Sequence, residues 1–111
     1  MYQGIIIKES LRDEEILDCV TVHSAELWKT ESTPRYWTAL FFESEDEHFL
    51  QKLSHYLTGN WYVDMKCENT KILVFKDKVM SYKIGNNAAK DKIVDYCLSI
   101  GIPQEQCDWP E

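Results

Sequence analysis

The hydrophobic pattern of the first third of the chain predicts two strands and a short helix. Residues 4–9 form a β-branched run that is typical of a strand. Ser10 and the acidic residues that follow it resemble a helix N-terminus, and the helix is expected to end near residue 19. Residues 20–28 favour a second strand, and the Ser-Thr-Pro segment at 32–34 marks a turn.

Residues 36–43 predict a strand with two apolar faces. Strict alternation places Tyr36, Leu40 and Phe42 on one face and Trp37, Ala39 and Phe41 on the other. Such a strand lies in the middle of a sheet, or something else covers its second face. Each face of this strand is therefore expected to be covered.

A Ser-x-x-Glu capping box at residues 44–47 predicts that a helix begins at Ser44. Five apolar side chains then recur at helical spacing on one face, and the Thr-Gly-Asn segment at 58–60 ends the helix. We expect this helix to lie on a sheet through its apolar face, which consists of Phe49, Leu50, Leu53, Tyr56 and Leu57.

The second half of the chain predicts a meander and a last helix. Strands are expected at 61–67, 70–76 and 79–84 because short turn signals separate them, and a helix runs from 85–87 to the Gly-Ile-Pro stop at 101–103. The predicted fold class is α+β, a mainly antiparallel sheet with the order β-α-β-β-α-β-β-β-α along the chain and helices mostly on one face. The first six elements have the order of a ferredoxin-like core.

Length and charge limit the function. One hundred and eleven residues predict a single domain, residues 1–111. The formal net charge of −7 argues against nucleic acid or an anionic membrane as the partner. The first 65 residues hold five basic and twelve acidic side chains. The acidic residues either stabilise helix N-termini or form an acidic surface for a basic protein. Residues 66–92 hold seven lysines and three acids, which either protect strand edges or form an anion site.

We expect a cytoplasmic protein, because the first residues lack a signal-peptide pattern and no apolar run approaches the roughly 20 residues that span a bilayer. The four cysteines are then expected as reduced thiols, with Cys97 buried and unreactive on the last helix. The pairs His48 with His55 and Cys19 with His23 lack a spacing or a settled geometry that suits a shared metal ion. We therefore expect no metal and no other cofactor.

The aromatic residues gather on predicted strands, and core packing accounts for most of them. If helices cover one side of the sheet, the other side exposes aromatic side chains that a partner, a ligand or a second subunit covers. The candidate interface or ligand residues are Tyr36, Trp37, Phe41, Trp61 and Tyr62. No catalytic residue is assigned, because the sequence sets no nucleophile beside a base.

Four phrases of the sequence are similar to a family of small bacterial proteins of about this length. They are residues 8–11 (Lys-Glu-Ser-Leu), 36–38 (Tyr-Trp-Thr), 61–64 (Trp-Tyr-x-Asp) and 101–109 (Gly-Ile-Pro-x-x-Gln-x-Asp-Trp). The resemblance covers most of the chain and implies a bacterial, intracellular origin. It carries no known activity.

Two classes of function fit these patterns. The first is a small acidic interaction or regulatory module that docks another protein or a second copy of itself, as inhibitors of basic enzymes do. In its simplest form a second copy covers the exposed aromatic face; the alternative is that the C-terminal tail with Trp109, or a helix, covers it within one chain. The second class is a small enzyme or a small-molecule carrier with an aromatic-lined pocket between sheet and helices, using tyrosine, Asp64 and a histidine.

Overall fold

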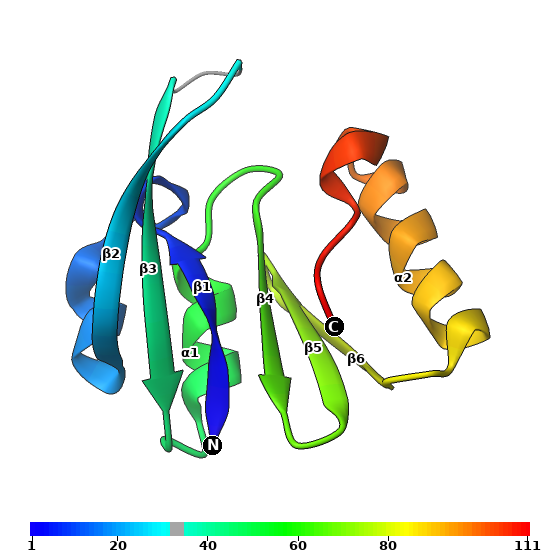
Figure 1. Cartoon of the computed structure of the whole chain (residues 1–111), viewed down its shortest axis with the longest axis horizontal. Helices are drawn as coiled ribbons and strands as arrows, with labels where there is room; N and C mark the ends of the chain where they lie inside the picture. Colours follow the sequence, from blue (N-terminus) through cyan, green and yellow to red (C-terminus); the bar gives the residue numbers. More distant parts are fainter. Residues whose placement is uncertain (32–34) are drawn as a thin grey trace.

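The computed structural model describes residues 1–31 and 35–111, so the turn predicted at 32–34 lies outside the described residues. These described residues form six strands, two α-helices and three short 3-10 helices (Figure 1). The strands are β1 (Tyr2–Ile7), β2 (Thr21–Lys29), β3 (Tyr36–Ser44), β4 (Tyr62–Cys67), β5 (Thr70–Phe75) and β6 (Lys78–Lys83). The helices are η1 (Lys8–Ser10), η2 (Glu14–Cys19), α1 (Phe49–Tyr56), α2 (Asn87–Ser99) and η3 (Gln104–Gln106).

The strands form one sheet in the order β2-β3-β1-β4-β5-β6, and every neighbouring pair is antiparallel. The predicted α+β class with an antiparallel sheet is therefore confirmed. Because β1 lies between β3 and β4, the strand order in the sheet is not the order predicted along the chain. β2 and β6 are the edge strands, and a bulge interrupts the β2–β3 pairing between Val22 and Ser24.

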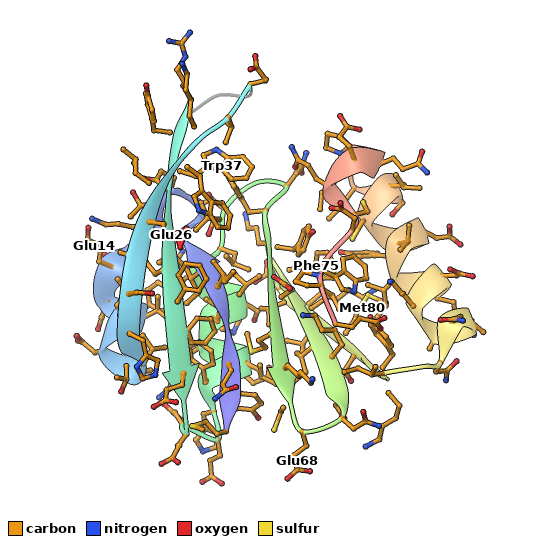
Figure 2. All side chains as sticks on the ribbon, viewed as in Figure 1. Glu14, Glu26, Trp37, Glu68, Phe75 and Met80 are labelled. Carbon is orange, nitrogen blue, oxygen red and sulfur yellow. The ribbon has the colours of Figure 1, made fainter. Side chains whose placement is uncertain are left out.

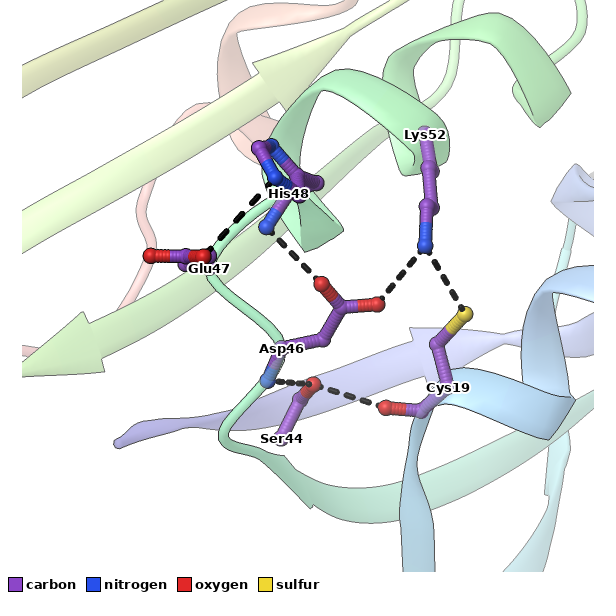
Figure 3. Close-up of polar contacts among 6 residues, drawn as sticks. All are labelled: Cys19, Ser44, Asp46, Glu47, His48 and Lys52. Atoms are coloured by element: carbon purple, nitrogen blue, oxygen red, sulfur yellow. Dashed lines mark hydrogen bonds and ion pairs between the residues drawn. The ribbon is translucent and has the colours of Figure 1, made fainter.

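Two helix predictions are wrong in detail. The expected helix over residues 10–19 is two separate 3-10 helices, η1 and η2. The capping box does not begin a helix at Ser44, because β3 continues through this residue and α1 begins at Phe49. The hydroxyl of Ser44 is buried and donates to the carbonyl oxygen of Cys19 at 2.7 Å (Figure 3). The N-cap residue of α1 is His48, whose side chain makes no capping hydrogen bond, and Asp46, two residues earlier, accepts from the backbone N–H of His48 at 2.8 Å.

Helices lie on both faces of the sheet, so the prediction that they lie mostly on one face is wrong. Phe49 and Leu53 of α1 and Ile16 of η2 pack in a core on one face. Ile93 and Cys97 of α2 belong to a second core on the opposite face. The reason is β5, which is buried on both sides: alternation sends its side chains into the two cores in turn.

The second face is covered over only half of its width. The C-terminal tail, residues 103–111, and α2 lie over β4, β5 and β6 (Figure 1). We call this the covered half; it carries Phe75 and Met80, whereas Trp37 lies toward β2 and β3 (Figure 2). The same face of β2, β3 and β1 is the open half, and it carries Ile5, Trp28, Trp37, Ala39 and Phe41.

The two halves meet where β1 pairs with β4 through three residue pairs, Gln3 to Ile5 against Asp64 to Lys66. Gly4 has no side chain at this junction, and a Cβ atom there would lie 2.4 Å from the carbonyl oxygen of Asp64. The close approach of β1 and β4 therefore requires glycine.

Candidate functional site

A groove of about 360 Å³ lies along the border between the open half and the covered half. Its residues come from β1, the paired strands β2 and β3, the segment that leads into β4, and the C-terminal tail. Most of them are apolar or aromatic. The lining consists of Ile5, Ile7, Trp28, Trp37, Asn60, Trp61, Tyr62, Asp64, Glu105, Gln106, Asp108, Trp109 and Pro110.

Two pairs of aromatic rings stand nearly perpendicular to each other in this lining. The ring centroids of Trp37 and Trp61 are 4.8 Å apart, with an angle of 66° between the ring planes. Those of Tyr62 and Trp109 are 5.7 Å apart, with an angle of 78°. Edge-to-face pairing holds such rings in place and presents aromatic faces in more than one direction.

Hydrogen bonds fasten the C-terminal tail to the covered half. The indole N–H of Trp109 donates to the hydroxyl of Tyr82 at 2.9 Å, and that hydroxyl donates to Glu111 at 2.6 Å. The hydroxyl of Tyr62 donates to the carbonyl oxygen of Gln106. Burial raises the pKa of Tyr62, and burial followed by the Glu111 bond raises the pKa of Tyr82 to about 12. Both phenols therefore stay protonated and keep donating at neutral pH.

The polar lining of the groove is acidic. Asp64 accepts from the ammonium group of Lys71 at 2.8 Å, and the two side chains are 19% and 5% exposed. Glu105 and Asp108 contribute two further carboxylates, and no lysine or arginine is among the described residues that line the groove. Asp64 and Lys71 compensate each other, so Glu105 and Asp108 leave the groove with negative charge.

The candidate residues from the sequence fall into three groups. Trp37, Trp61 and Tyr62 line the groove. Phe41 lies on the open half beside it, where its ring contacts Trp28 edge to face at 6.5 Å. Tyr36 alternates with Trp37 and so lies on the opposite side of the sheet, where it is exposed.

Sequence reasoning left Trp28 out of the site. Its signal was present in the strand pattern, since Trp28 ends the run predicted for the second strand and pairs directly with Trp37. Glu105 and Asp108 could not be placed, because their position depends on the path of the tail. That path is fixed by long-range bonds such as the one from Trp109 to Tyr82.

A second polar cluster surrounds Cys19, at the end of η2 (Figure 3). The ammonium group of Lys52 lies 2.9 Å from Asp46 and 3.9 Å from the sulfur of Cys19. Burial nevertheless raises the pKa of this thiol, with a contribution from Asp46. The contacts join η2, the end of β3 and α1, so they serve the packing of that face.

Among the described residues, no group of three or more histidine, cysteine, aspartate or glutamate side chains could hold a metal ion. None of the helices in the described part of the chain combines the length and the apolar character that a membrane crossing needs. Comparison with family models, with curated proteins and with solved structures finds no match to this chain.

Proposed function

We propose that this protein is a small protein-interaction module and that the open half of its sheet docks a segment of another polypeptide. The observation that supports this most directly is the aromatic groove. The chain returns to cover one half of the sheet face and leaves Trp28, Trp37 and Phe41 of the other half only partly buried. Apolar surface of this kind, bordered by polar residues, is typical of an interaction site.

Charge favours a basic partner over a second copy. The net charge of −7 makes two copies repel each other, whereas it steers a basic protein toward the surface. The acidic lining at Glu105 and Asp108 adds to this preference at the groove itself. A small-molecule carrier is the second candidate, because about 360 Å³ falls within the size range of small-ligand pockets.

A selection experiment tests the module. The protein is exposed to a displayed library of random twelve-residue peptides, and we expect extended peptides rich in basic residues to be enriched. Trp37→Ala should abolish the enrichment, while Leu98→Ala, which changes an exposed leucine on α2, should preserve it. Enrichment that ignores Trp37→Ala, or no enrichment at all, would overturn the proposed function.

The fold type, the relatives and the cellular location of the protein are also proposals. We propose a ferredoxin-like core over β1 to β4, supported by the neighbour order β4-β1-β3-β2 and by η2 and α1 on a single face. We also propose membership in the group of small bacterial proteins that the sequence resembles. A cytoplasmic location is supported by four free cysteines, which suit a reducing compartment.

A further inference from the structure

We infer that the groove holds a basic side chain of the partner, a lysine or an arginine, among the aromatic rings and carboxylates of its lining. This inference rests on the proposed function and specifies what the docked segment must carry. It depends on three properties of the groove: the identity of its rings, the sign of its charges and its size.

Tryptophan offers the best aromatic face for a cation, and the groove has four tryptophans and one tyrosine in its lining. The perpendicular pair of Trp37 and Trp61, whose side chains are both half-buried, gives the groove ring faces in two orientations. The chain uses the same contact within itself. The ammonium group of Lys78 lies 4.1 Å from the ring centroid of Tyr96, and that of Lys90 lies 6.0 Å from Trp109.

The carboxylates give the groove a preferred sign. Glu105 and Asp108 make no ion pair within the part of the chain that the structure describes, whereas Asp64 is already bound to Lys71. Two uncompensated carboxylates beside aromatic walls attract a cation and repel an anion. An apolar side chain would gain the contact with the rings but not the charge interaction.

The volume selects a side chain over a larger group. About 360 Å³ accommodates the long apolar stem and the charged end of one basic residue together with a neighbouring side chain. The backbone of such a segment would remain on the open half, over β3 and β1. The rest of the partner would stay outside the groove.

The probes are pentapeptides acetyl-Ala-Val-Xaa-Val-Ala-amide in which the central residue is lysine, arginine, norleucine or glutamate. Binding is measured by the NMR shifts of the tryptophan indole N–H signals. We expect the lysine and arginine peptides to bind about tenfold more tightly than the norleucine peptide, and the glutamate peptide to bind most weakly. Raising sodium chloride from 50 to 500 mM should weaken the two basic peptides and leave the norleucine peptide unchanged.

Two variants separate the contributions. The double variant Glu105→Gln with Asp108→Asn should reduce the difference between the lysine and norleucine peptides severalfold while keeping norleucine binding. Trp61→Leu should weaken the basic peptides more than the norleucine peptide, because it removes a ring face and keeps an apolar side chain. Leu98→Ala is the control, and the dispersed NMR spectrum of each variant verifies its fold.

The outcomes distinguish this inference from the proposed function. If norleucine binds as tightly as lysine, the cation site is wrong and the docking module stands. If tetramethylammonium binds as tightly as the lysine peptide, the groove serves a free cation and the inference about a partner's side chain is wrong. If no pentapeptide shifts the indole signals and the library selection is also empty, the proposed function itself is wrong. A dimer mass by light scattering with the indoles shielded would overturn both.

Discussion

The covered and open halves belong to the same face of the same sheet, yet their side chains differ in how far they are buried. In the covered half, Leu73 and Phe75 are 0% and 1% exposed beneath α2 and the tail. In the open half, Trp28 and Trp37 stay partly exposed although they are larger side chains. Strand pattern alone is similar in the two halves. What differs is whether a later part of the chain returns to cover them, and this decides whether an aromatic residue is buried in a core or stays partly exposed.

The border between the halves has its own chemistry. Asp64 and Lys71 form an ion pair with both side chains largely removed from solvent, where the apolar cover ends and the groove begins. A buried charge pair contributes little net stability, but removing one partner leaves the other as an unpaired buried charge. The border is therefore sensitive to substitution even though neither residue lies in the centre of a core.

Phe75→Ala is expected to have the largest effect, a loss of about 3–5 kcal/mol in the free energy of unfolding, because it empties a filled site under α2. Trp37→Ala in the open half should cost only about 1–2 kcal/mol. Urea denaturation of both variants measures the contrast. Equal losses would mean that the open half is as much a part of the folded core as the covered half.

Lys71→Met should lower the free energy of unfolding by about 2–4 kcal/mol, because it leaves the carboxylate of Asp64 without its partner. Adding Asp64→Asn to this variant should recover part of the lost free energy of unfolding, since the unpaired carboxylate is then removed. Urea denaturation of the two single variants and the double variant gives the coupling. Additive losses would show that the two side chains act independently at the border.

The thiols should report how firmly the covered half is closed, with Cys19 and Cys67, which are half-buried against the core on the opposite face, as the reference. Burial raises the pKa of Cys97 to about 12 and also raises the pKa of Cys107, and both lie in the covered half. With Ellman's reagent at pH 8, Cys19 and Cys67 should therefore react at least about tenfold faster than these two. Mass spectrometry of partly modified protein identifies the order. Early modification of Cys97 would show that α2 and the tail open readily.

The smallest effect on stability is expected on the face of the sheet that η2 and α1 cover, which serves as a reference for both halves. The hydrogen bond from Lys52 lowers the pKa of Asp46 from its ordinary 3.8 to about 2. A lowered native pKa stabilises the fold above the unfolded value, so this contribution should be lost as the pH falls from about 4 to 2. Asp46→Asn should flatten the acid slope of stability in that window. An unchanged slope would remove the role of this contact.

The sequence predicted the strands well because their patterns are local. The run from Trp61 to Cys67 alternates strictly, and the turns at Glu68 and Asp77 lie where Asn and Asp signals stood; both residues adopt positive φ. The predicted burial of Cys97 is also confirmed. The predicted helix start at Ser44 is wrong because the hydroxyl of Ser44 donates to the carbonyl oxygen of Cys19, which is distant in sequence. No local pattern records such a contact.

The site was predictable in part for the same reason. Trp37, Trp61 and Tyr62 could be named from strand composition, and all three line the groove. Their meeting with Trp109 depends on a tail that crosses from α2 back to β6, and the capping pattern of α2 does not encode that path. The prediction that the helices lie mostly on one face also missed that side chains of β5 enter two cores, because a strand with apolar residues on both faces leaves the side of each helix undetermined.

The edge position of β2 has a consequence for how the protein behaves when it is concentrated. An edge strand of nine residues offers unpaired backbone groups to any passing strand and is a starting point for aggregation. In β2 the bulge between Val22 and Ser24 bends this edge, and Glu26 and Lys29 place charges along it. The strand that holds Trp28 beside the groove thus also carries features that oppose the addition of further strands.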